Sequence, residues 1–137
     1  MVERRGAILV AALLALALAA AAWAGGSAVT DVTAGEARTL IQERAGKADF
    51  TILDVRTPAE FAEGRLSGAV NLDIQAPDFE TRLKALDRAK TYLVYCRTGN
   101  RSRGAIQAME RLGFRSVFHM TEGVVGWQKQ KLPLSRS

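Results

Sequence analysis

The stretch TYLVYCRTGNRS, residues 91–102, contains the clearest strand signal of the chain and, directly after it, a loop with the chain's one cysteine. Residues 91–95 form an apolar run of the length that is typical of a buried strand. Residues 102–112 then predict a helix, with apolar residues at helical spacing and Gly113 as its stop. A strand that passes through a short loop into a helix is a building unit of α/β domains.

The same alternation continues through the rest of the chain. Three further runs predict strands: residues 50–55, 69–72 and 116–120. Four further segments predict helices: one from Thr33 to about Gly46, one that begins at Thr57, one over residues 78–86 and one over residues 124–131. The first two begin with a Thr three residues before a Glu, which is the pattern of a capping box. Together these segments predict one α/β domain in three layers, with a mainly parallel central sheet flanked by helices.

The first 24 residues have the pattern of an export signal. Arg4 and Arg5 form a basic start, an apolar run follows over residues 8–22, and Ala22-Trp23-Ala24 matches the small-x-small cleavage pattern. The sequence therefore predicts a signal peptide over residues 1–24, a mature domain over residues 25–137 and a periplasmic location. The alternative is an uncleaved amino-terminal anchor, which would place the domain at the periplasmic face of a membrane.

Composition excludes several classes of function. A chain of 137 residues with a net charge of +5 fits a single domain that favours small anionic ligands. The basic residues are scattered without interleaved aromatic residues, so nucleic-acid binding is not expected. One cysteine and one histidine give no metal-binding constellation, and no cofactor is expected. We expect a monomer that contacts a membrane only if the amino-terminal segment is uncleaved.

The single cysteine, Cys96, has two possible roles. An exported protein with one cysteine cannot form an internal disulfide, although its compartment favours disulfides. One interpretation is therefore an inert thiol that fills core space. The other is a reactive thiol, and the position of Cys96 favours it, because ligands of open α/β sheets bind at the carboxyl ends of the strands.

The loop after Cys96 has the residues of an anion-binding nest. Gly99 and Asn100 tolerate unusual backbone angles, so the loop can curl with its N–H groups pointing inward. The following helix adds the positive end of its dipole. The loop residues that we expect to bind an anionic substrate are Arg97, Thr98, Gly99, Asn100 and Arg101.

Three arginines lie close to the thiol in sequence: Arg97, Arg101 and Arg103. Their charges, the nest and the helix terminus all favour a thiolate, and such surroundings lower a cysteine pKa from about 8.5 into the range of roughly 3.5–7.5. The sequence therefore predicts that Cys96 is an activated nucleophile, whereas an inert thiol would leave Gly99 and the arginines unexplained.

At this point four motifs resemble a known family. In order along the chain they are DVRTPAEF at residues 54–61, GRLSGAVN at residues 64–71, CRTGNRS at residues 96–102 and EGVVGW at residues 122–127. They resemble a single-domain rhodanese over about residues 30–134. The resemblance implies a rhodanese-like α/β domain over residues 25–137 and a sulfurtransferase, a thiosulfate sulfurtransferase of the rhodanese type, in which Cys96 carries a persulfide. One departure is Arg65, where the family often has His.

The resemblance also suggests supporting residues. It implies a buried polar network of Asp54, Arg56 and Glu60, with Arg101 as a further candidate member. We interpret this network as a scaffold for the loop, because a carboxylate that faced the thiolate would oppose its ionisation. His119, the one histidine, lies in a predicted strand and is expected to be structural or exposed, since the nest makes a separate base unnecessary. Trp127 is expected to pack in the core or at its rim.

Three functions stay open at this level. The first is catalytic transfer of sulfur from a small anionic donor such as thiosulfate to cyanide or a thiol. The second is a cysteine phosphatase or arsenate reductase, which needs Arg six residues after Cys, but that position is Ser102 and the arginines are at 101 and 103. The third is a non-catalytic carrier that takes a persulfide from a partner and passes it on.

Overall fold

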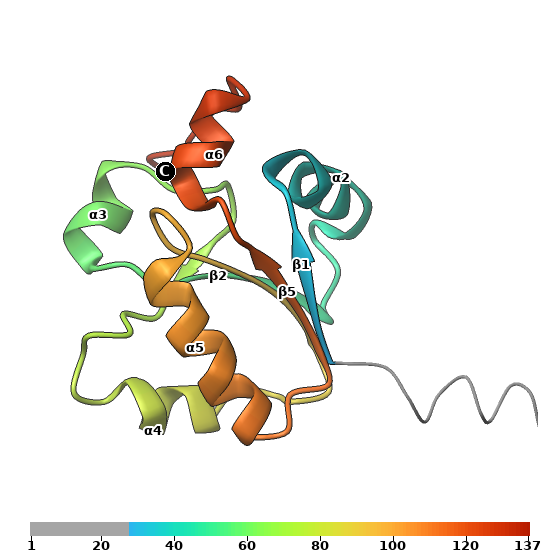
Figure 1. The fold of residues 1–137 in the computed structure, drawn as a ribbon, viewed down its shortest axis with the longest axis vertical. Helices are drawn as coiled ribbons and strands as arrows, with labels where there is room; N and C mark the ends of the chain where they lie inside the picture. The colour runs from blue at the N-terminus through green and yellow to red at the C-terminus, as the bar shows by residue number, and fades with distance from the viewer. Residues whose placement is uncertain (1–27) are drawn as a thin grey trace, which may run out of the picture.

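The computed structural model describes residues 28–137, which form a five-stranded sheet with helices on both faces (Figure 1). The strands are β1 (Val29–Val32), β2 (Phe50–Asp54), β3 (Val70–Asn71), β4 (Thr91–Tyr95) and β5 (Ser116–Met120). They lie in the order β1-β5-β4-β2-β3, and every neighbouring pair is parallel. The predicted α/β class with a mainly parallel sheet is confirmed.

The helices follow the predicted segments closely. They are α2 (Ala34–Arg44), α3 (Pro58–Glu63), α4 (Phe79–Lys84), α5 (Asn100–Arg111) and α6 (Gly123–Lys129). Both predicted capping boxes are present, with Thr33 and Thr57 as the N-caps. Helix α5 begins two residues earlier than predicted, at Asn100, so the loop between Tyr95 and the helix is short.

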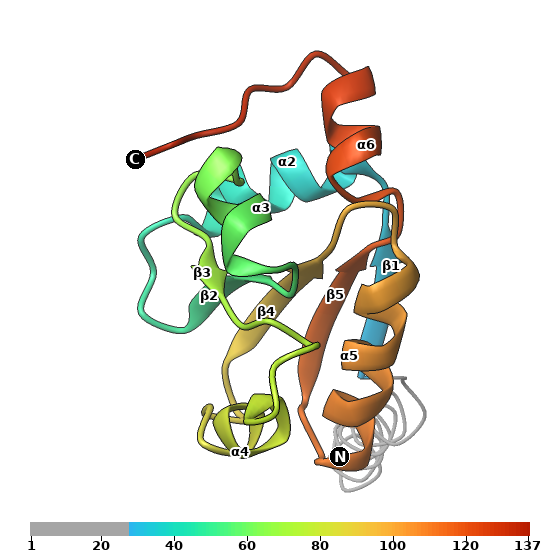
Figure 2. The same ribbon diagram turned by 90° about the vertical axis from the view of Figure 1, so that its left-hand side faces the viewer.

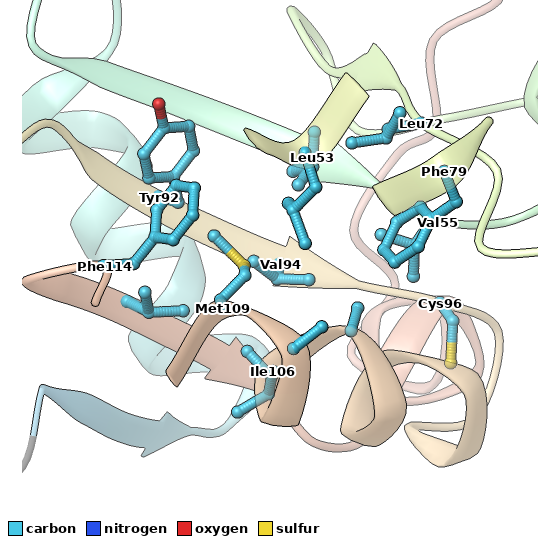
Figure 3. Close-up of a cluster of buried hydrophobic side chains, with 14 residues drawn as sticks. Leu53, Val55, Leu72, Phe79, Tyr92, Val94, Cys96, Ile106, Met109 and Phe114 are labelled. Atoms are coloured by element: carbon cyan, nitrogen blue, oxygen red, sulfur yellow. The ribbon is translucent and has the colours of Figure 1, made fainter. Parts of the chain in front are cut away.

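The central strand β4 divides the core into two parts. Side chains of a strand alternate between the two faces of a sheet. Tyr92 and Val94 pack into the apolar cluster that α4 and α5 cover, whereas Leu93 and Tyr95 belong to the cluster that α2 and α6 cover. Cys96 follows the same alternation as Tyr92 and Val94 and belongs to the cluster under α5. Figure 3 shows it at one end of this cluster, beside the loop that leads into the helix.

Strand β1 is an element that the sequence did not predict. It pairs with β5 at the edge of the sheet, from Val29 opposite Val117 to Val32 opposite Met120. Two of its four residues are exposed, because only one of its sides has a neighbouring strand. Short edge strands of this kind carry little apolar pattern, since most of their stabilisation comes from a distant partner.

The predicted signal peptide over residues 1–24, and its alternative as an anchor, lie outside the described residues. Within residues 28–137, none of the helices combines the length and the apolar character that crossing a bilayer requires.

Candidate active site

Cys96 lies at the carboxyl edge of the sheet, between the end of β4 and the start of α5. Its side chain is buried, with an exposed fraction of 1%. Gly99 is also buried and ends the loop with φ +95°, whereas Arg97, Thr98 and Asn100 are exposed around it. The loop therefore holds its thiol inward and presents its polar side chains outward.

The sulfur of Cys96 accepts hydrogen bonds from its own loop. The Gly99 N–H donates to Sγ at 3.1 Å. Burial by itself would raise the pKa of the Cys96 thiol, but hydrogen bonds from the Ser102 hydroxyl and from the amides of Ser102, Thr98 and Gly99 outweigh burial, and the pKa is lowered. The amino terminus of α5 lies beside the sulfur and adds the positive end of its dipole. This arrangement favours the thiolate.

Two glycines allow the loop to lie directly against the turn between β5 and α6. A Cβ on Gly99 would lie 2.0 Å from the Thr121 carbonyl oxygen, and a Cβ on Gly123 would lie 2.3 Å from the Arg97 carbonyl oxygen. Both glycines have positive φ, which other residues rarely adopt. The amides of Val124 and Val125 then donate to the carbonyls of Cys96 and Arg97, each at 3.0 Å. The start of α6 thus fixes the loop from one side.

A pocket of about 600 Å³ opens beside the loop. Arg97 lies in its wall, together with residues of α3, of α6 and of the carboxy-terminal segment, including Arg136. Figure 2 shows that segment running from α6 past α3, and the Arg136 Nε donates to the Glu63 carbonyl at 3.0 Å. The pocket gives a small molecule a place next to the loop, with the exposed guanidinium of Arg97 at its wall.

Arg101 and Glu60 connect the site to α3. The guanidinium of Arg101 donates to both carboxylate oxygens of Glu60, at 2.7 and 2.9 Å. This pairing, with help from Thr57, lowers the pKa of Glu60 to about 2 against the opposing effect of burial. Arg101 is therefore engaged by a carboxylate, and its role at the site includes bracing the first turn of α5.

Asp54 and Arg56 form a second, separate group. Nη2 of Arg56 lies 2.7 Å from Oδ2 of Asp54 and donates to the Gly64 carbonyl at 2.6 Å, and the Tyr95 hydroxyl donates to Asp54 at 2.7 Å. Leu53 and Val55, which flank Asp54, belong to the cluster of Cys96, so alternation turns the Asp54 carboxylate to the opposite face of the sheet. The side-chain hydrogen bonds of the predicted network thus fall into two groups, which are linked by the charges of Glu60 and Arg56.

Arg65, the departure from the family pattern, has a structural contact. Its guanidinium lies over the Phe61 ring, 4.3 Å from the centroid, and donates to the Phe61 carbonyl at 3.1 Å. Its backbone pairs with Ser135 in an antiparallel bridge. Arg65 therefore helps to hold the carboxy-terminal segment that borders the pocket.

His119 and Ser102 are brought together next to the site, a contact that the sequence did not predict. His119 was predicted to be structural or exposed, and it is buried, with Nε2 2.7 Å from the Ser102 hydroxyl oxygen. The two residues are 17 positions apart, so the contact becomes visible only when α5, which carries Ser102, packs on β5, which carries His119. Trp127 is buried as predicted, and its Nε1 donates to the Pro133 carbonyl at 2.9 Å.

Comparisons of sequence and of structure with known proteins indicate the same family. Residues 33–130 match the model of the Rhodanese-like domain. A sulfurtransferase of Allochromatium vinosum is 28% identical over 99 residues, which are 72% of this chain and 91% of that protein. The uncharacterized protein YibN of Escherichia coli is 34% identical over 113 residues, 80% of this chain and 75% of that protein. A rhodanese-related protein of Thermoplasma volcanium matches in structure with a TM-score of 0.64 and 28% identity, covering 78% of this chain and 98% of the other.

Proposed function

Because the chain belongs to the Rhodanese-like domain family, a sulfurtransferase-like family, we propose that it is a thiosulfate sulfurtransferase. Its substrates are a small anionic donor, thiosulfate or a similar compound, and an acceptor that is cyanide or a thiol. Cys96 carries the sulfur between them as a persulfide. The observation that carries this proposal is a buried thiol with a lowered pKa at the carboxyl edge of the sheet, beside a pocket with the exposed Arg97 in its wall.

The first half-reaction loads the enzyme. The Cys96 thiolate attacks the outer sulfur of thiosulfate, a new S–S bond forms, and the S–S bond of the donor breaks with sulfite as the leaving group. The charge that was on the Cys96 sulfur moves to the terminal sulfur of the persulfide. The amides of Thr98 and Gly99 and the hydroxyl of Ser102, which face the sulfur, are placed to stabilise this negative charge.

The second half-reaction removes the sulfur from the Cys96 persulfide. Cyanide or a thiolate attacks the terminal sulfur, and the Cys96 thiolate is the leaving group, so the same low pKa that makes Cys96 a nucleophile makes it a good leaving group. The covalent intermediate replaces one difficult transfer by two easier ones. Arg97 attracts the anionic donor to the pocket, because its guanidinium is exposed there and Arg101 is already paired with Glu60.

The spacing of the loop argues against a phosphatase or arsenate reductase. The residue six positions after Cys96 is Ser102, which is buried and bonded to His119. Of the two arginines that flank Ser102, Arg101 is turned toward Glu60 and Arg103 lines a separate pocket with His119. An oxyanion on Cys96 would therefore lack the guanidinium that those enzymes use at that position.

A steady-state assay with thiosulfate and cyanide tests the proposal. We expect thiocyanate to form over many turnovers, and Cys96→Ser to abolish its formation while the fold is kept, because the hydroxyl ionises far less readily than the thiol. A carrier would instead load once and release thiocyanate in an amount close to that of the protein. Turnover by Cys96→Ser at the wild-type rate would remove the assignment.

We also propose that residues 1–24 direct the protein to the periplasm and are then removed. The basic start, the apolar run and the Ala22-Trp23-Ala24 site support this proposal. Amino-terminal sequencing of the cell-produced protein should give a start near Gly25. Recovery of Met1 in a membrane fraction would support the anchored alternative and leave the chemistry unchanged.

A further inference from the structure

The Ser102 hydroxyl lies between two groups that can exchange a proton. Its oxygen is 2.7 Å from Nε2 of His119, and the same hydroxyl is one of the groups that lower the pKa of the Cys96 thiol. The exposed fractions of the Ser102 and His119 residues are 0% and 4%, so water does not compete freely for these contacts. Cys96, Ser102 and His119 therefore form a continuous chain of polar contacts that starts at the nucleophile.

The number of protons in this chain couples the ionisation of Cys96 to His119. A serine hydroxyl has one proton to donate. When that proton is donated to a Cys96 thiolate, the close contact with His119 requires a proton on Nε2, which donates to the Ser102 oxygen. When Cys96 is a thiol, its proton can be donated to the Ser102 oxygen, and the hydroxyl proton can be donated to a bare Nε2. A neutral ring with its proton on Nε2 would also fit the thiolate, but Asp31 Oδ1 lies 3.7 Å from Nδ1 and favours the tautomer with the proton on Nδ1. Starting from that tautomer, a proton added to Nε2 gives the imidazolium.

We propose that His119 sets the ionisation of Cys96 by proton transfer through Ser102. The Cys96 proton moves to the Ser102 oxygen as the Ser102 proton moves to Nε2 of His119, which turns a thiol and a neutral imidazole into a thiolate and an imidazolium without net loss of a proton. His119 acts through another residue and is thus a positioning residue. This inference rests on the proposed role of Cys96 as the nucleophile.

The surroundings of the ring suit this task. Two charged groups act on it, Asp31 from β1 and Arg103 from α5, and Glu110 of α5 lines the same pocket. Burial lowers the pKa of His119, and Arg103 adds to this, which favours the neutral ring that can accept a proton. Asp31 acts in the opposite direction, with Oδ1 3.7 Å from Nδ1, and supports the imidazolium once it has formed.

A second pocket, of about 390 Å³, connects this chain of contacts to solvent. His119, Asp31 and Arg103 lie in its wall, and it shares no lining residue with the pocket beside Arg97. A proton on His119 can therefore leave on a side of the loop that the sulfur donor does not occupy. The sulfur donor would thus enter through the pocket beside Arg97, and the proton would leave through the pocket beside His119.

The first experiment follows thiolate formation by absorbance near 240 nm in the full chain as pH rises, with Cys96→Ser as the blank. His119→Gln keeps a polar nitrogen near the position of Nε2 but cannot accept a proton. We expect it to raise the midpoint by about one pH unit, a tenfold loss of thiolate below the midpoint. Ser102→Ala should also raise the midpoint, and adding His119→Gln to Ser102→Ala should cause no further shift. Wild-type behaviour of His119→Gln, or fully additive shifts, would overturn the proposal.

A second experiment avoids changing His119. It is the one histidine of the chain, so its ring signals in an NMR titration of untagged protein are unambiguous. We expect the His119 midpoint to be higher in the wild type than in Cys96→Ala, because binding free energies of linked protons are reciprocal. Equal midpoints would overturn the proposal. Neither experiment requires sulfur transfer, so this inference and the proposed function can fail independently.

Discussion

Arg101 and Glu60 join the first turn of α5 to α3 through two hydrogen bonds, at 2.7 and 2.9 Å. The residues come from segments 41 positions apart, and both side chains keep about a quarter of their surface exposed. Because α5 follows directly on the loop of Cys96 and α3 borders the pocket, this pair sets the position of the loop relative to the pocket. Arg101, which was expected to bind the substrate, thus also helps to hold the loop in position.

Removing this pair should lower stability and turnover together. We expect Glu60→Gln to lower the free energy of unfolding by about 1 to 2 kcal/mol at pH 7, between the values for exposed and buried pairs. The matched control is Glu80→Gln, whose pair with Arg111 is exposed and 4.0 Å long, and it should change little. Urea unfolding and the thiosulfate assay measure both effects, and equal stability of the two variants would contradict the account.

The same pair predicts a pH dependence with a definite sign. The pKa of Glu60 is lowered from 4.5 to about 2 in the folded protein, so its contribution is complete above pH 4.5 and is lost as pH falls toward 2. The difference in unfolding free energy between wild type and Glu60→Gln should therefore shrink across this interval. A difference that stays constant from pH 5 to pH 2 would show that the carboxylate is not stabilised by Arg101.

Gly99 and Gly113 provide a matched test of the loop. Both have positive φ, +95° and +81°, but a Cβ on Gly99 would strike the Thr121 carbonyl, whereas a Cβ on Gly113 meets nothing within 4 Å. We expect Gly113→Ala to cost about 1 kcal/mol from backbone strain alone. Gly99→Ala should cost more and should also reduce turnover strongly, because the loop must move. Similar turnover of the two variants would contradict the role given to this contact.

Arg97 should act through charge. Arg97→Gln is expected to raise KM for thiosulfate several-fold at low salt with a smaller change in kcat, and the defect should shrink as ionic strength rises. Arg115→Gln removes an equal charge from an exposed residue outside the pocket wall and serves as the control. If both variants keep the wild-type dependence on thiosulfate at low salt, the loop amides and the helix terminus alone must account for anion recognition.

Tyr95 should matter for stability and not for chemistry. Its hydroxyl donates to Asp54 and accepts from the Leu66 amide at 3.1 Å, on the face of the sheet opposite to Cys96. Tyr95→Phe leaves both partners buried without it and should lower the free energy of unfolding by about 1 to 3 kcal/mol. The folded variant should keep its kcat, and a loss of kcat without a loss of stability would assign Tyr95 to the reaction.

The sequence was most informative where structure depends on near neighbours. The capping boxes at Thr33 and Thr57 involve residues three apart, and the alternation along β4 is set by the strand itself. The positive φ of Gly99 follows from the tight passage of the strand into α5. These features were predictable because a local pattern determines each of them.

Contacts between distant segments were predicted least well. Strand β1 is short and half exposed, and its stability depends on pairing with β5, nearly ninety positions later. The sequence left open which carboxylate pairs with Arg101, because the packing of α3 against α5 decides that partner. His119 gave no signal of its role, since a lone histidine in a strand is compatible with any buried contact.

The central claim is that Cys96 accepts and releases a sulfane sulfur, and intact-mass measurement tests it most directly. After incubation with thiosulfate, the reduced protein should gain the mass of one sulfur atom, located on the peptide that contains Cys96, and cyanide should remove it with release of thiocyanate. Cys96→Ser should gain nothing. A wild-type protein that keeps its original mass with thiosulfate and with other sulfane sulfur donors, or a Cys96→Ser variant that gains the same mass, would contradict the account.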